Sequence, residues 1–118
     1  MSDRFIFKLL TQEQWDAFKS EKVFSGAPID IADGYIHFSS ASQVAETAEK
    51  YFADLPTVIL AEVDVENLSI PVAWEPSRGG ALFPHLSATL PIGAVTRTSA
   101  LEKGADGRLI FPDWALAG

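Results

Sequence analysis

The sequence contains no cysteine. Disulfide bridges, thiolate metal sites and a cysteine nucleophile are therefore excluded. The start of the chain, MSDRFIFKLL, lacks the apolar core and cleavage site of a signal peptide, and no apolar run approaches the length of a membrane span. We therefore expect a cytoplasmic protein that does not enter a membrane.

Positive charge is scarce along the chain. Nine Lys and Arg stand against sixteen Asp and Glu, which gives a net charge of −7. Residues 30–75 hold nine of these acids and one base, Lys50. Such a surface repels a nucleic-acid backbone, so nucleic acid is not an expected partner. The excess of acid serves either solubility or the steering of a cationic partner.

The motifs of several enzyme classes are also missing. The chain has no Walker A, GxGxxG, GxSxG or HExxH sequence. Its two histidines lack carboxylates at a matched spacing, so we expect no metal site. Ser39 follows His37 closely, but adjacency in sequence does not make a catalytic triad, because geometry decides.

The chain contains enough apolar residues to form one packed domain, residues 1–118. Hydrophobic residues make up 47% of its 118 positions and charged residues 21%. Seven stretches are candidates for about six short strands: an apolar run at residues 57–65, which predicts a central strand, and shorter stretches near 5–10, 35–39, 72–74, 81–86, 94–101 and 108–111. Strands do not alternate regularly with helices, which favours an α+β fold over a doubly wound sheet.

Two capping-box patterns predict the helices of the first half. Thr11 and Gln14 open one helix, with Trp15 and Phe18 on its inner face. Ser40 and Gln43 open another, whose buried face we expect to comprise Val44, Ala48, Tyr51 and Phe52. Residues 24–28 are expected to form a loop, and Asp33-Gly34 is a turn signal.

The stretch GYIHFSSASQ, residues 34–43, is the first candidate site. In a strand, His37 and Ser39 share one face with Tyr35. Ser39, Ser40 and Gln43 then gather at the start of the second helix, where backbone N–H groups favour an anion or a ligand oxygen. The alternative is structural: Ser40 and Gln43 are ordinary caps, and His37 is a half-buried histidine bonded to backbone.

The second candidate site is EPSRGGALFPHLS, residues 75–87. It brings together Glu75, Arg78 and His85, with Trp74 at one end and with Gly79 and Gly80 allowing a close approach of the backbone. Arg78 has the planar fork that holds a phosphate or carboxylate. The alternative is a turn stabilised by a Glu75–Arg78 pair, with His85 facing solvent and Trp74 in the core.

Three segments together resemble a known family. DIADGYIHFSSASQVAETAEKYF, VILAEVDVENL and WEPSRGGALFPHL are similar to the bacterial domain-of-unknown-function family 952, over nearly the whole chain. One departure is visible, since Ser87-Ala88 follow FPHL where the family usually has a tyrosine and a small residue. A role that depends on that tyrosine is therefore not expected in this chain.

The resemblance implies a fold similar to ADP-ribosyltransferases and RNA 2′-phosphotransferases, in which a mixed, split sheet forms a cleft for NAD or an ADP-ribosyl group. By that analogy His37 contacts a ribose beside Ser39, and His85 lies across the cleft. Arg78 then meets phosphate, and Glu75 is the candidate for the catalytic glutamate. This is an inference from fold alone.

The leading hypothesis is a monomeric protein with a polar cleft that binds NAD, ADP-ribose or a related phosphorylated nucleotide and acts as a transferase or hydrolase. The first alternative is a non-catalytic module for a small acidic metabolite or a protein segment, and the second is a stress-associated partner protein with no small ligand. All cleft readings predict that His37 and His85 approach within one pocket, at roughly 5–10 Å.

Overall fold

The computed structural model describes residues 4–76 and 80–116. Its α-helices are α1 (Gln12–Glu21), α2 (Pro28–Asp33), α3 (Val44–Tyr51) and α4 (Asp113–Leu116), and its 3₁₀ turns include η1 (Val65–Asn67) and η3 (Ile92–Ala94). Its strands are β1 (Phe5–Thr11), β2 (Val23–Phe24), β3 (Ile36–His37), β4 (Val58–Asp64), β5 (Ala73–Pro76), β6 (Leu82–Leu86), β7 (Leu90–Pro91), β8 (Val95–Lys103) and β9 (Leu109–Ile110). The α+β prediction is confirmed.

The strands form three separate sheets. The largest has the order β1-β4-β8-β9, a second has the order β3-β6-β5, and β2 pairs with β7. Every pairing between the strands described is antiparallel, so the expected mixed sheet is wrong. Strand β4 lies between β1 and β8 and is buried along its whole length, as predicted.

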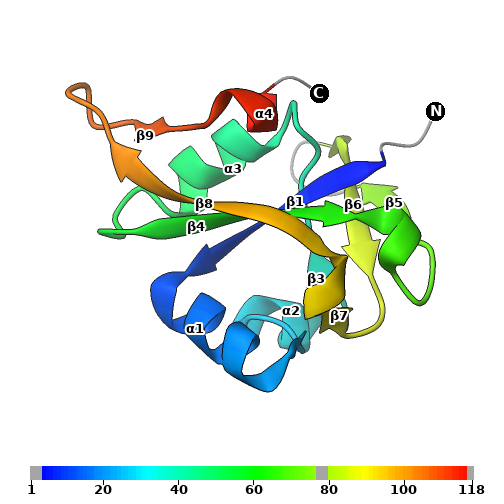
Figure 1. Ribbon diagram of the computed structural model, residues 1–118. Coiled ribbons are helices and arrows are strands. Elements are labelled where there is room, and N and C mark those ends of the chain that lie inside the picture. Colours follow the sequence, from blue (N-terminus) through cyan, green and yellow to red (C-terminus); the bar gives the residue numbers. More distant parts are fainter. Residues whose placement is uncertain (1–3, 77–79, 117–118) are drawn as a thin grey trace.

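Helices cover both faces of the largest sheet. Figure 1 shows α3 and α4 on one face, with α1 and α2 on the other. Two apolar cores follow from this arrangement, because alternate residues of β1 and β4 point to opposite faces. Val44 and Ala48 of α3 belong to one core, and Phe18 of α1 belongs to the other.

The first helix begins as predicted. The Thr11 side chain accepts from the backbone N–H of Gln14, and the Gln14 side chain accepts from the backbone N–H of Thr11. Phe18 is fully buried, and Trp15 packs against it edge to face with ring centroids 5.6 Å apart.

None of the helices within residues 4–76 and 80–116 is long and apolar enough to span a membrane.

Helix α2 was missed, because its six residues are too few for a periodic pattern. The predicted loop at residues 24–28 instead contains the end of β2 and the start of α2. Pro28 fits the first turn, since its fixed φ suits a helix start and its missing N–H is not needed there. Gly34 ends the helix with a left-handed φ of 87°, which agrees with the predicted turn.

The start of α3 differs from the prediction. Gln43 accepts from the backbone N–H of Ser40, but the Ser40 hydroxyl contacts Ser42 Oγ and so does not complete the capping box. The helix begins only at Val44. Its inner face contains Val44 and Ala48, whereas Tyr51 is 60% exposed, contrary to expectation.

Candidate functional site

A cavity of about 450 Å³ opens beside the edge strand β1. It lies among β1, α2, β3, β6 and α3, and its walls are largely aromatic and aliphatic. Its lining includes Leu9, Asp30, Asp33, His37, Ser39, Tyr51, Phe52, Phe83 and His85. Its volume lies within the range of about 300–1,000 Å³ that is usual for small-molecule sites.

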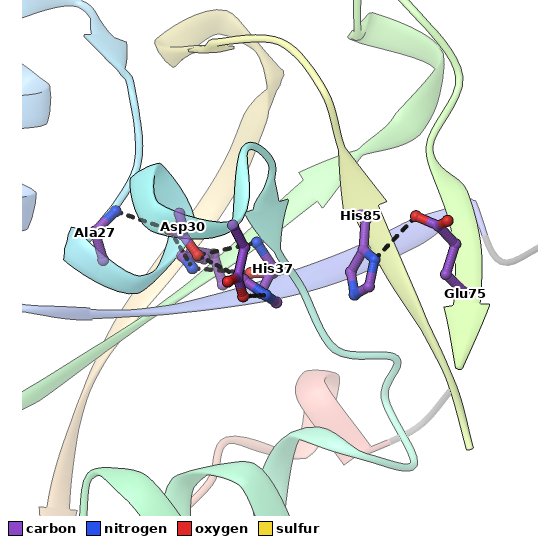
Figure 2. Close-up of polar contacts among 7 residues, drawn as sticks. Ala27, Asp30, His37, Glu75 and His85 are labelled. Atoms are coloured by element: carbon purple, nitrogen blue, oxygen red, sulfur yellow. Dashed lines mark hydrogen bonds and ion pairs between the residues drawn. The ribbon is translucent and has the colours of Figure 1, made fainter. Parts of the chain in front are cut away.

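Asp30 of α2 is the polar residue around which the cavity wall is organised, and its side chain is buried, with 1% of the residue exposed. Its carboxylate accepts from the backbone N–H groups of Ala27 and His37, at 2.8 and 3.1 Å. It also contacts His37 Nδ1 at 2.6 Å (Figure 2). Lys8 Nζ lies 3.0 Å from the same carboxylate. Burial raises the pKa of Asp30, but Lys8, His37 and the Ala27 N–H together outweigh burial and hold that pKa below its usual value.

Lys8 is the cation that balances Asp30. It projects from β1 between Ile6 and Leu10 and is 7% exposed. Its ammonium also donates to the carbonyl of His37 at 2.8 Å. Burial lowers the pKa of Lys8, although the Asp30 carboxylate opposes this shift. Since its ammonium is already committed to these two oxygens, Lys8 is not a free cation for a ligand.

His37 is held between two carboxylates. Nδ1 contacts Asp30, and Nε2 lies 3.0 Å from Asp33 Oδ2. Both contacts are hydrogen bonds only when both ring nitrogens carry a proton. Asp30 is buried, but the Asp33 side chain is 43% exposed, so Nε2 faces the open side of the site. A buried carboxylate behind an imidazole is the arrangement that orients general acid–base histidines.

His85 stands beside His37 on the neighbouring strand. The two residues are direct register partners in the β3–β6 pair, and their ring centroids are 5.1 Å apart. The Tyr35 ring stacks on His85 at 4.2 Å. The Glu75 carboxylate lies 3.2 Å from His85 Nδ1. The two imidazoles therefore lie between Asp30 on one side and Glu75 on the other (Figure 2).

Strand β1 contributes main-chain groups to the cavity. Phe7 exchanges two backbone hydrogen bonds with Ser39 on the side away from β4. Hydrogen-bonding direction alternates along an antiparallel strand, so the N–H and C=O of Leu9 point to the same side. No strand among the described residues continues beyond Ser39 to pair with Leu9. One donor and one acceptor therefore face the cavity at this edge.

The predicted approach of the two histidines is confirmed, but their arrangement differs. His85 does not lie across a cleft from His37, because both occupy adjacent strands of one wall. It does not face solvent either, since it is 3% exposed. Ser39 lines the cavity as expected, with its hydroxyl 3.2 Å from Thr47 Oγ1.

Among the residues that the structure describes, the other predicted ligand contacts do not reach the cavity. Gln43 Nε2 donates to the carbonyl of Leu82, and Ser40 bonds to Ser42. Trp74 packs against the core, as the alternative reading held. Of the residues that the structure describes, Ser40, Gln43, Trp74, Glu75 and Gly80 are not in the cavity wall. Arg78 and Gly79 lie outside the described residues.

Three residues of the candidate site were missed: Lys8, Asp30 and Asp33. The only local signal was at Asp30, an acid two residues after Pro28, where the first turn of a helix accepts a carboxylate. Lys8 gave no signal, because a lysine inside an apolar strand is usually read as its exposed face. No group of three or more His, Asp or Glu side chains suited to a metal ion occurs in the described part of the chain.

The fold and this cavity define a small α+β domain with a pair of histidines on the wall of a ligand-sized site. The chain belongs to the family described as "Protein of unknown function (DUF952)", whose model matches residues 9–98. The resemblance drawn from its motifs is therefore confirmed at the level of the family. No curated protein matches the chain.

Solved structures of one bacterial protein are similar to this chain. The crystal structure of protein CC0527 from Caulobacter crescentus, a structural genomics target, is 41% identical, with a TM-score of 0.86 over 94% of this chain and 97% of that one. The solution NMR structure of CC0527 is 42% identical, with a TM-score of 0.79 over 90% of this chain and 91% of the other. The fold is therefore shared over nearly the full length of both chains.

Proposed function

We propose that the cavity binds a nucleoside-containing small molecule, with NAD, ADP-ribose and related phosphorylated nucleotides as the candidates, and that it acts on this molecule as a transferase or hydrolase. One observation carries the proposal: a buried carboxylate, Asp30, holds His37 on the wall of an aromatic cavity. This combination supplies an oriented proton-exchanging group and an apolar surface for a flat ring.

The size and lining of the cavity suit the nucleoside part of such a molecule. Its volume of about 450 Å³ accommodates a base with its sugar, while phosphate groups extend toward the mouth. Phe52 and Phe83 offer apolar rings to a base, and Tyr51 also lines the cavity. The main-chain pair of Leu9 adds a donor and an acceptor at the edge of β1, which match the edge of a base or an amide.

The charges of the wall favour an uncharged group in the interior. Asp30 and Asp33 both line the cavity, and the Lys8 ammonium is neutralised by Asp30. A carboxylate or phosphate placed among these groups would be repelled. The alternative of a non-catalytic site for a small acidic metabolite is therefore less well supported than a site for a sugar or a base.

The proposed chemistry with NAD is cleavage of the bond between the nicotinamide nitrogen and the ribose. The bonding electron pair leaves with nicotinamide, and the oxygen of water or of an acceptor hydroxyl bonds to the ribose carbon. The proton that this oxygen loses is taken by an imidazole of the cavity. The proposal includes the ADP-ribosyltransferase-like fold, with the sheets β1-β4-β8-β9 and β3-β6-β5 as the two halves of a split sheet around the cavity.

The test combines binding and turnover. Adenosine, ADP-ribose and NAD are titrated in a thermal-shift assay, in which a ligand of the folded state raises Tm with the logarithm of its concentration. Nicotinamide release from NAD is followed by chromatography. We expect His37→Gln to lower turnover by about 10²–10⁴-fold while binding changes much less, since glutamine can still donate to Asp30. Glu21→Ala, an exposed change on α1, is the control. Failure of all three compounds to raise Tm would refute the proposal.

A further inference from the structure

His85 carries a ring nitrogen that has no hydrogen-bond partner. Its Nε2 atom is buried and, within the described residues, unpartnered. A buried polar atom without a partner is costly, and such atoms are rare in native proteins. An orphan of this kind, on a residue that lines a cavity, indicates a partner that arrives with a bound molecule.

The state of the ring follows from its other nitrogen. An ionised carboxylate only accepts hydrogen bonds, so the contact between Glu75 Oε1 and His85 Nδ1 places a proton on Nδ1. In the neutral ring this leaves Nε2 with a lone pair and no proton. Glu75 thus sets the tautomer of His85, as Asp30 orients His37.

The ring is also fixed in orientation. Tyr35 stacks on one face with an interplanar angle of 13°, and His37 meets it edge to face at 72°. Nδ1 is directed toward Glu75, which is not in the cavity wall. Nε2 therefore lies on the part of the ring that is turned away from Glu75. Because Nε2 is itself buried, a donor reaches it only when side chains of the wall shift, and such shifts are common on binding.

We infer that His85 Nε2 is the hydrogen-bond acceptor of the cavity, and that the bound molecule presents to it an uncharged donor, a hydroxyl or an N–H. His37 cannot have this role in the geometry described, because both of its ring nitrogens already face carboxylates. An acceptor-only anion, such as a carboxylate or phosphate, is excluded from this position. The inference rests on the proposed function and deepens it by naming the group that the site selects.

The test uses three small aromatic probes: phenol, anisole and benzoate. Phenol has the donor, anisole lacks it, and benzoate replaces it with an anion. At pH 8 we expect phenol to bind the wild type roughly three- to tenfold more tightly than anisole, which is the usual contribution of one net hydrogen bond. We expect benzoate to bind more weakly than both.

His85→Phe is the decisive variant, since it keeps a flat ring against Tyr35 and removes both nitrogens. It should abolish the preference for phenol over anisole, while the Tm of the free protein stays equal or rises because the orphan atom is gone. Glu21→Ala is again the control, with the preference unchanged. A His85→Phe protein that retains the preference, or a wild type that favours benzoate, would overturn the inference.

If His85→Phe does not fold, a second measurement tests whether Nε2 of His85 is the acceptor. Long-range ¹H–¹⁵N NMR of the wild type reports which ring nitrogen of His85 carries the proton. We expect the proton on Nδ1 and a shift of the Nε2 resonance when phenol is added, and a proton on Nε2 alone would contradict the inference. If phenol behaves as expected but adenosine, ADP-ribose and NAD do not bind, the nucleotide proposal fails and the assignment of His85 stands.

Discussion

Replacement of Asp30 by asparagine tests the physical basis of the site. The carboxylate accepts from two backbone N–H groups, from His37 Nδ1 and from Lys8 Nζ. Asparagine retains one oxygen, but its amide nitrogen would face donors, and Lys8 would become a buried charge without a counter-ion. Breaking a buried ion pair in this way costs about 3–5 kcal/mol. We expect Tm to fall by roughly 10–20 °C for a chain of this size.

Urea denaturation followed by Trp fluorescence measures the loss in the free energy of unfolding. Two further variants test whether the loss comes from the buried ion pair. Asp33→Asn removes a carboxylate that is 43% exposed and should cost less than about 1 kcal/mol. Lys8→Met in the Asp30→Asn background removes the stranded ammonium and should restore about half of the loss or more. A cost for Asp30→Asn below about 1 kcal/mol, or a double variant no more stable than the single one, would refute this account of the site.

The same carboxylate predicts part of the acid unfolding. Because the pKa of Asp30 is depressed in the folded protein, its contribution is fully present above about pH 4, the ordinary Asp value. That contribution is lost as the pH falls through the lower, folded value. The free energy of unfolding of the wild type should therefore fall more steeply below about pH 4 than that of Asp30→Asn. Parallel curves for the two proteins would argue against a depressed pKa.

Two further predictions concern the backbone around the cavity. Gly26 has a φ of 123°, and a Cβ there would lie 2.8 Å from Asp30 Cβ, so Gly26→Ala should cost about 1–3 kcal/mol in urea denaturation. Gly93→Ala, where no described atom lies within 4 Å of the new Cβ, should change stability by less than about 0.5 kcal/mol, and equal costs would contradict the argument. In hydrogen-exchange NMR, the Leu9 amide should exchange at least roughly tenfold faster than that of Lys8, which points toward β4. Similar protection of both amides would mean that the edge of β1 is not open.

Much of the fold was predictable because its signals are local. The capping box at Thr11 and Gln14, the apolar run of β4 and the inward face of α3 at Val44 and Ala48 each depend on residues close in sequence. Because neighbouring residues of a strand point to opposite faces, the sequence also predicts that Ile36 and His37 have different surroundings. Ile36 lies in the core, and His37 lines the cavity. Tyr51 shows the limit of such patterns, because helical spacing cannot say where the neighbouring strand ends and solvent begins.

The candidate site was only half predictable, for a physical reason. The sequence by itself determined that His37 and His85 lie in two polar stretches on apolar strands. The tertiary structure decided that these strands pair with the two histidines in register, on one wall instead of on two. It also decided that Lys8 meets Asp30 across 22 positions of the chain, inside a core that a lone charge could not enter. A buried charge is stable only beside its partner, and that partner is set by strand register and helix placement, which no local spacing encodes.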